Sequence, residues 1–255
     1  MARSTKDPAP KRGRSKGPGK GEPGDSPPEA GNAPRTRTAK SLSKDAPRAS
    51  SSFAAQVGFG SGARAPLGDD KSKGYLVGQL LIAMPTMMDP RFQRTVIFMC
   101  AHDERGAMGL VLNRLIEALT FPELLKQLGI EPEKTSQRPI HFGGPVDMGR
   151  GFVLHSDDYN QDGTVLVKPG YSVTATVDIL HAIAKGEGPI ESLLALGYAG
   201  WGPGQLDDEI QANGWLHAPA DHTLVFDPNL ESKWERAMAK IGVDLSVLSG
   251  EAGHA

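Results

Sequence analysis

Residues 80–114 read LLIAMPTMMDPRFQRTVIFMCAHDERGAMGLVLNR and contain most of three apolar runs, at 76–84, 95–101 and 108–112. The middle run, TVIFMCA, is rich in β-branched and aromatic residues and shows no polar alternation, which is typical of a strand buried on both faces. Only a short polar loop ending in Gly106 separates it from the third run, so these two runs can form a hairpin. We therefore expect this stretch to be the nucleus of a sheet.

In the rest of the chain, hairpins come in pairs and helices come singly between them. Further strands are predicted at 140–142, 151–155, 164–167, 171–175 and 223–226. Helices are predicted at 120–129, 177–185 and 206–213 and after Asp227-Pro228, the first with a capping box of Thr120 and Glu123 and the second capped by Thr176. Residues 190–199 suit either a short helix or a strand. This order favours an α+β domain around a mostly antiparallel or mixed sheet.

The near-neutral net charge of −2 hides a basic arm joined to an acidic body. Residues 1–70 hold 9 of the 20 prolines, with 13 Lys/Arg against 7 Asp/Glu, a net charge of +6. Because so polar a segment cannot offset the entropy of ordering it, we expect residues 1–72 to be a disordered Pro/Gly/Ser-rich arm and residues 73–255 to form one domain. The chain has one cysteine and shows neither a secretory signal nor an apolar stretch of about 18 residues, so we expect a cytoplasmic protein.

Three blocks of sequence carry a likeness to a known family. Residues 80–114, followed by HFGGPV at 141–146 and LGYAGWGPGQLDDEIQANGW at 196–215, resemble the YqgE/AlgH family of uncharacterised bacterial proteins. The resemblance implies an α+β fold in which a branched sheet curls into a partial barrel with flanking helices. It implies no reaction, although members are often labelled transcriptional regulators. The body shows no helix-turn-helix motif, and its net charge of −8 over residues 71–255 opposes DNA binding by the folded part.

Each of these blocks ends a strand or begins a helix, so we expect them to converge on a binding site for a small anion. An arginine can grip a carboxylate or phosphate, and paired glycines can form an anion-binding nest, as can a glycine-rich loop that enters a helix. The alternatives are a solvated hairpin end, a tight turn between two close backbones and a tryptophan that anchors the core. The candidate ligand-binding residues are Asn113, Arg114, Gly143, Gly144, Gly200, Trp201 and Gly204.

A catalytic reading rests on three residues. His102, Asp207 and Glu209 are acid/base candidates if the protein is an enzyme, although acidic residues at a helix start are also favoured by the helix dipole. Cys100 lies inside an apolar run, where burial should raise its thiol pKa and keep it unreactive. The sequence has no histidine pair at metal-ligand spacing and no phosphate-loop, dinucleotide or nucleophile-elbow motif, so we predict neither a metal nor a cofactor.

Three functions remain open at this point. The first is a non-catalytic binding or regulatory protein that recognises a small anionic ligand or a protein partner. The second is an enzyme acting on a phosphorylated or nucleotide-like substrate. The third is a nucleic-acid-associated regulator that makes weak, salt-sensitive contacts through its basic arm. None of the three involves a membrane.

Overall fold

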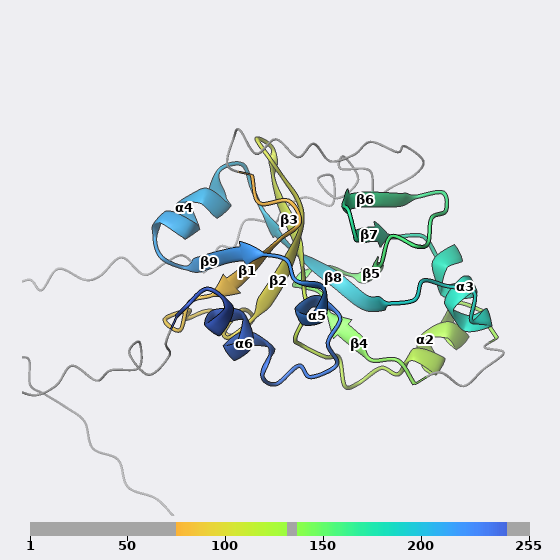
Figure 1. Cartoon of the computed structure of the whole chain (residues 1–255). Coiled ribbons are helices and arrows are strands. Elements are labelled where there is room, and N and C mark those ends of the chain that lie inside the picture. The colour runs from red at the N-terminus through yellow and green to blue at the C-terminus, as the bar shows by residue number, and fades with distance from the viewer. Residues whose placement is uncertain (1–74, 132–136, 244–255) are drawn as a thin grey trace, which may run out of the picture. The chain divides into compact units, whose positions relative to one another are not determined.

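The computed structural model describes residues 75–131 and 137–243, so the predicted arm at 1–72 lies outside the described residues. One curled sheet of nine strands is flanked by five helices within them (Figure 1). The strands are β1 (Gln79–Ala83), β2 (Val96–Asp103), β3 (Gly106–Val111), β4 (Ile140–Phe142), β5 (Val146–His155), β6 (Thr164–Lys168), β7 (Tyr171–Thr174), β8 (Ser192–Trp201) and β9 (Trp215–Pro219). The helices are α2 (Phe121–Gln127), α3 (Asp178–Lys185), α4 (Gln205–Gln211), α5 (His222–Val225) and α6 (Lys233–Lys240).

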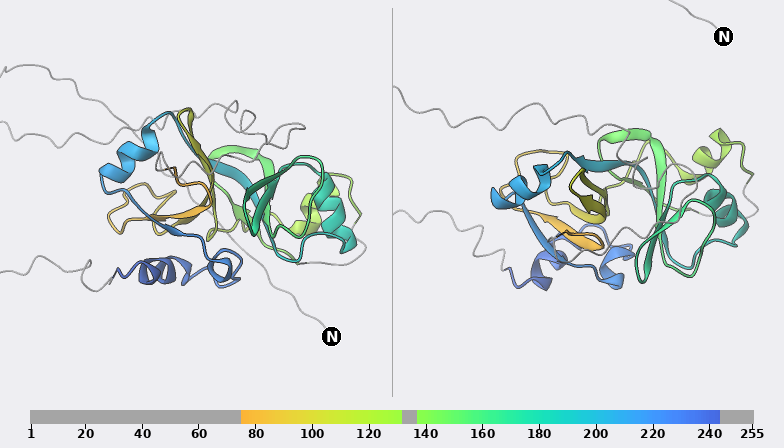
Figure 2. Two further views of the ribbon diagram at one scale, coloured as in Figure 1. Left: turned by 45° about the horizontal axis from the view of Figure 1, so that its top comes forward. Right: turned by 90° about the horizontal axis from the view of Figure 1, so that it is seen from above.

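The sheet branches at β8. The strand order is β6-β7-β5-β8-β3-β2-β1-β9, and β4 pairs with β8 outside this path. One edge of β8 pairs with β5, while its other edge pairs first with the parallel strand β4 and then with the antiparallel strand β3. Figure 2 shows how the two halves curl away from this junction. The predicted α+β class and the branched, curled sheet are therefore confirmed.

Residues 80–114 form most of three adjacent strands of the sheet, in the order β3-β2-β1. β2 and β3 are an antiparallel hairpin, with Ile97 opposite Val111 and His102 opposite Ala107. Side chains of β2 alternate between two separate cores, since Phe98 packs in one and Ile97 in the other. Because both faces of the strand are covered, its sequence shows no polar alternation.

Three local predictions need correction or completion. The ambiguous segment 190–199 belongs largely to the ten-residue strand β8. The strand predicted at 223–226 is wrong: this segment forms the short helix α5, because the Asp221 side chain accepts the backbone N–H groups of Thr223 and Leu224 and so caps a helix. Thr176 does not cap α3, whose N-cap is Val177 without a side-chain hydrogen bond.

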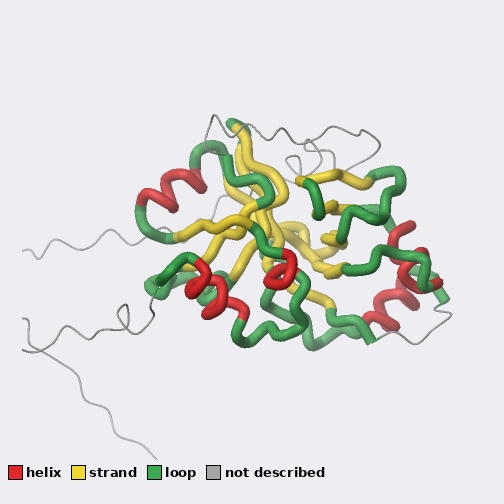
Figure 3. Tube along the Cα trace, in the orientation of Figure 1, coloured by secondary structure: helices red, strands yellow, loops and turns green. Residues whose placement is uncertain are grey.

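The helices cover the two faces of the sheet unequally. On the inner face, α5 and α6 pack on the largest core, which holds Phe98, Tyr198 and Trp234. On the outer face, α4 covers the end formed by β1, β2, β3 and β9, and α2 and α3 lie side by side over β4, β5 and β8 (Figure 3). The outer face therefore carries two separate cores, and the second one borders the groove described below.

A lysine links the edge strand β6 to the segment that leads into β1. Lys168, at the end of β6, donates from Nζ to the carbonyl oxygen of Gly78 at 3.1 Å, just before β1 begins. This contact joins the last strand of one branch to the start of the other. No helix in residues 75–131 and 137–243 has the length and apolar character that a membrane span requires.

Candidate functional site

The three family-like blocks meet through their backbones. The Val111 N–H donates to Gly143 O at 2.9 Å, and the Gly143 N–H donates to Leu196 O at 2.9 Å. A further bond, from the Phe142 N–H to Arg114 O at 2.9 Å, joins the exit of β3 to β4. The expected convergence therefore exists at the middle of β8, and backbone hydrogen bonds create it.

The paired glycines are explained by how closely two chains pass there. A Cβ on Gly144, whose φ is +152°, would lie 2.1 Å from the carbonyl carbon of Tyr198. A Cβ on Gly143 would lie 2.2 Å from Gly197 O, and one on Gly197 would lie 2.4 Å from Gly144 O. The alternative of two close backbones accounts for this geometry, and the Gly143 N–H that a nest would use already donates to Leu196.

Asn113 and Arg114 hold the loop that precedes β2. Asn113 accepts the Val96 N–H on Oδ1 at 2.9 Å and donates from Nδ2 to Arg94 O at 2.8 Å. The Arg114 guanidinium donates from Nη2 to Gln93 O at 2.7 Å. Both side chains thus stabilise a backbone path, and their role toward a ligand stays a prediction.

The third block builds a partly buried polar cluster between α4 and two tryptophans. The indole N–H groups of Trp201 and Trp215 both donate to Glu209 Oε2, at 2.9 and 2.7 Å, and Gln205 donates to Oε1 at 2.9 Å. Gly204 is the N-cap of α4 at a φ of 69°, and Gly200 pairs with Met108 inside the sheet. Trp201 therefore packs as a core anchor, and Glu209 fixes the helix on two tryptophans.

His102 and Asp207 form the closest approach to an acid/base pair among the predicted residues. Their side chains lie 3.7 Å apart, from Nε2 to Oδ2, with Asp207 exposed and His102 only 5% exposed. The Leu76 N–H donates to His102 Nδ1 at 3.2 Å, so that nitrogen accepts and Nε2 carries the proton of the neutral ring. Burial lowers the pKa of His102, against the opposing effect of Asp207.

These predicted residues occupy two ends of β3. Ala107, near its start, pairs with His102 on one side and with Trp201 on the other. Asn113 and Arg114 lie beyond its far end. The candidate catalytic residues therefore gather beside Trp201 and Gly204, and the candidate anion-binding arginine lies away from them.

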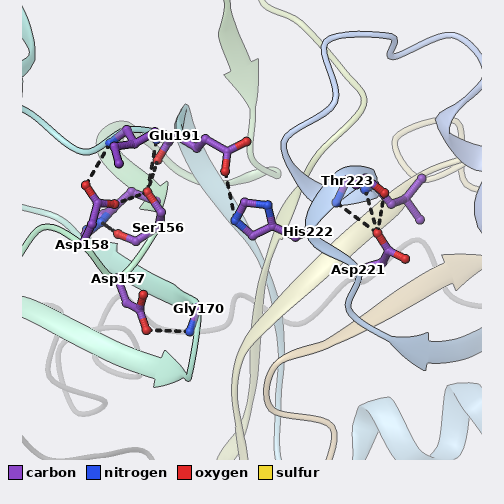
Figure 4. Close-up of polar contacts among 11 residues, drawn as sticks. Ser156, Asp157, Asp158, Gly170, Glu191, Asp221, His222 and Thr223 are labelled. Carbon is purple, nitrogen blue, oxygen red and sulfur yellow. Dashed lines mark hydrogen bonds and ion pairs between the residues drawn. The ribbon is translucent and has the colours of Figure 1, made fainter.

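A second histidine–carboxylate pair has no signal in the sequence. His222 Nε2 lies 3.0 Å from Glu191 Oε2, and both side chains are largely exposed (Figure 4). Beside it, the backbone of Glu191 exchanges hydrogen bonds with Ser156, and Asp158 accepts the Ile190 N–H at 3.1 Å. These bonds fasten the start of β8 to the end of β5, and the pair is separated by 31 positions in the chain, so spacing could not reveal it.

Metal binding and cysteine chemistry have little support in the described part of the chain. Residues 75–131 and 137–243 contain no group of three His, Cys, Asp or Glu side chains that could hold a metal ion. Cys100 is fully buried in the inner core, and burial raises the pKa of its thiol.

The main feature that sequence reasoning missed is a groove on the outer face. A cavity of about 130 Å³ opens between α2 and α3, which we call the α2–α3 groove. Leu124 of α2 and the C-cap Leu128 form one wall, and the N-cap Val177 and Leu180 of α3 form the other. Its floor contains Gly149 and Gly151 of β5 together with Leu194 and Leu196 of β8.

Most residues that line the groove are apolar, and the hydroxyl groups of its two threonines are already hydrogen-bonded within the domain. The Thr174 hydroxyl bonds His155 Nε2 at 2.9 Å, and the Thr176 hydroxyl accepts Gln161 Nε2 at 2.8 Å. At the rim, Leu128 and Val177 remain 41% and 45% exposed. What the groove offers to a ligand is therefore mainly exposed apolar surface.

A bulge in β5 keeps the floor open. Register with β8 jumps from Val146 opposite Tyr198 to Gly151 opposite Leu196, so four residues of β5 stand opposite Gly197 alone. A Cβ on Gly149 would meet no heavy atom within 4 Å, and one on Gly151 would make ordinary contact with Leu196 at 3.7 Å. Larger side chains at these two positions would fill the space.

The fold and these sites define a class: an α+β protein with a curled, branched sheet whose outer face carries an apolar groove. The chain belongs to the AlgH-like family, whose model matches residues 80–246. A UPF0301 protein of Beijerinckia indica is 56% identical over 190 residues, 71% of this chain and 93% of that protein. A UPF0301 protein of Rhodospirillum rubrum is 52% identical over 186 residues, 72% of this chain and 97% of that protein.

Solved structures agree with this assignment. The solution structure of AlgH from Pseudomonas aeruginosa, 44% identical, matches with a TM-score of 0.60 over 71% of this chain and 96% of that one. A crystal structure of a Corynebacterium diphtheriae protein, 21% identical, matches with a TM-score of 0.57 over 69% and 93% and supports the fold alone. The names of these relatives state no reaction.

Proposed function

We propose that this protein is a non-catalytic binding protein and that the α2–α3 groove is where it takes up apolar side chains of a protein partner. One observation carries the proposal: a cavity of about 130 Å³ that opens to solvent between Leu128 and Val177. A concave, mainly apolar pocket is a candidate binding site in a folded protein. Apolar anchors that fill such a pocket supply most of the affinity at protein interfaces.

A protein partner fits the charge of the domain better than a small anion. Residues 75–131 and 137–243 contain 12 Lys/Arg and 20 Asp/Glu, a net charge of −8, which disfavours the approach of an anion. The Gly143 N–H and the Arg114 guanidinium each already donate to a backbone carbonyl oxygen. An anionic ligand remains the less favoured form of the same binding hypothesis.

The test places a photo-crosslinking amino acid at Val177 in living cells. We expect a specific protein adduct there, which disappears when Gly149→Leu fills the floor of the groove. The matched control carries the crosslinker at Leu166 on β6, which is 46% exposed against 45% for Val177. Adducts that survive Gly149→Leu, or that form equally at Leu166, would count against the groove.

An enzyme acting on a phosphorylated or nucleotide-like substrate is the second candidate, and the 3.7 Å approach of His102 to Asp207 favours it. A thermal-shift screen with nucleotides and phosphosugars tests it. A substrate that raises the Tm of the native protein and is turned over, but is only bound by His102→Ala, would establish this reading. We place either activity in the cytoplasm, since the one cysteine is buried and unpaired.

A further inference from the structure

The α2–α3 groove is lined mainly by apolar residues, and the sequence of this chain contains a short apolar segment at 53–59. We infer that residues 53–59, FAAQVGF, dock in the groove, so that the N-terminal arm covers the surface to which the partner binds. The inference rests on the proposed function, because it concerns the regulation of the same site. Here the occupant of the groove is a segment of the same chain and not a separate protein.

Composition singles out this segment. Phe53 and Phe59 are the only aromatic residues among the first 74, and five of the seven residues at 53–59 are apolar. A cavity of about 130 Å³ has room for about one such side chain, since an engineered cavity of about 150 Å³ accommodates a benzene ring. In the rest of the arm, Pro, Gly and charged residues dominate and offer little to an apolar groove.

The tether is long enough. Val57 lies 18 positions before Tyr75, where the described structure begins, and a chain of that length spans up to about 60 Å. A domain of this size measures about 40 Å across, so the segment can reach most of its surface. Tethering also raises the effective concentration of the segment to the millimolar range, which makes a weak contact effective.

The opposite net charges of the arm and the described residues also favour this contact. Residues 1–70 carry a net charge of +6, and the described residues carry −8. Opposite charge on two parts of one chain favours their association, and salt weakens it. The family model begins at residue 80, so the groove belongs to the shared domain, and the segment at 53–59 precedes it.

The test uses engineered cysteine pairs in the full chain. The native Cys100 is buried with a raised thiol pKa, so it does not compete. Val57→Cys is combined with Val177→Cys at the rim or, as the matched control, with Leu166→Cys, and disulfide formation is followed with glutathione disulfide as the oxidant. We expect the rim pair to close at least ten-fold faster than the control pair. Equal rates, or a faster control, would overturn the inference.

A second variant tests whether the cysteines at positions 57 and 177 meet because the groove is open. Adding Gly149→Leu to the rim pair fills the groove at a position with open space, so the ten-fold preference should vanish. A preference that persists would mean that the segment docks elsewhere, and the inference would be wrong.

The two proposals can fail separately. In Phe53→Ser/Phe59→Ser, with the crosslinker at Val177, partner adducts should increase several-fold as the groove is uncovered. Unchanged adducts together with equal disulfide rates would remove the arm from the groove and leave the proposed function standing. In the third outcome, the crosslinker at Val177 captures only the arm of the same chain, and the rim pair of cysteines still closes ten-fold faster than the control pair. That result would support docking of the arm and contradict binding of a separate partner protein.

Discussion

Lys233 is the most unusual single residue of the domain. Its side chain is 0% exposed, and Nζ donates to the carbonyl oxygens of Leu224, Val225 and Asp227 at 2.7, 3.0 and 3.0 Å. These carbonyl groups lie at the C-terminal end of α5, where no further helical turn supplies N–H donors to them. Burial lowers the pKa of the ammonium to about 8. The lysine therefore acts as a buried cap that fixes α5 on α6.

Replacing this cap tests its role. Lys233→Met keeps the stem but leaves the carbonyl oxygens without a donor, so we expect the free energy of unfolding to fall by about 2–4 kcal/mol in urea titrations. The matched control is Lys240→Met, which removes an exposed ion pair with Asp221 and should cost less than about 1 kcal/mol. Equal losses in the two variants would refute the buried cap.

His141 makes the fold sensitive to acid. Burial, followed by the nearby charge of Lys233, lowers its pKa to about 4 from an ordinary value near 6.5. Between those values the unfolded chain binds a proton that the folded chain does not. The stability is therefore fully present above pH 6.5 and is lost as the pH falls toward 4.

We expect His141 to contribute up to about 3 kcal/mol to this loss. Urea unfolding at pH 7, 5.5 and 4 measures it, with His141→Gln as the comparison. The variant should retain a shallower pH dependence, because burial also lowers the pKa of His155. An identical slope in the two proteins would show that His141 is not responsible.

At the scale of elements, the segment around the start of β5 contains two glycine environments that can be compared directly. At the crossing with β8, Gly144 has a φ of +152° and no room for a methyl group. Five residues later, Gly149 has open space around it. We expect Gly144→Ala to cost more than about 3 kcal/mol and Gly149→Ala to change stability by less than about 1 kcal/mol. Similar urea midpoints for the two variants would contradict the crossing geometry.

Sequence reasoning succeeded where local chemistry decides the element. The capping box of Thr120 and Glu123 is encoded within four residues, and α2 begins there. It failed at 223–226, where the β-branched Thr and Val predict a strand but the cap at Asp221 and contacts with α6 select a helix. The segment 190–199 stayed ambiguous because its strand character comes from the three neighbours of β8.

The candidate site was harder to predict than the fold. The conspicuous glycine blocks signal close backbone packing, which a sequence cannot distinguish from a ligand nest. The α2–α3 groove is built from residues scattered between 124 and 196, and its key members are ordinary leucines, valines and small glycines. Only the folded sheet, with its bulge at β5, shows that they leave a space uncovered.

At the scale of the whole molecule, the placement of the helices explains why the open surface lies where it does. The inner face of the curled sheet is closed by α5 and α6, and Lys168 ties the edge strand β6 to the segment before β1. The outer face has to be covered piecewise, and the short helices α2 and α3 leave the strip between them uncovered. Binding at the groove would therefore leave the main core undisturbed.

The distribution of charge yields a prediction about nucleic acid. The described residues carry −8 and residues 1–70 carry +6, so any affinity for DNA or RNA should reside in the arm and fall steeply with salt. We expect the full chain to be retained on a DNA column at about 50 mM salt and released by about 200 mM, and the chain without residues 1–72 to pass through. The shortened chain should fold, since the matched region makes up 97% of the Rhodospirillum rubrum relative. Retention of the shortened chain would mean that the acidic domain itself binds nucleic acid, and the partner-binding assignment of its surface would then have to be abandoned.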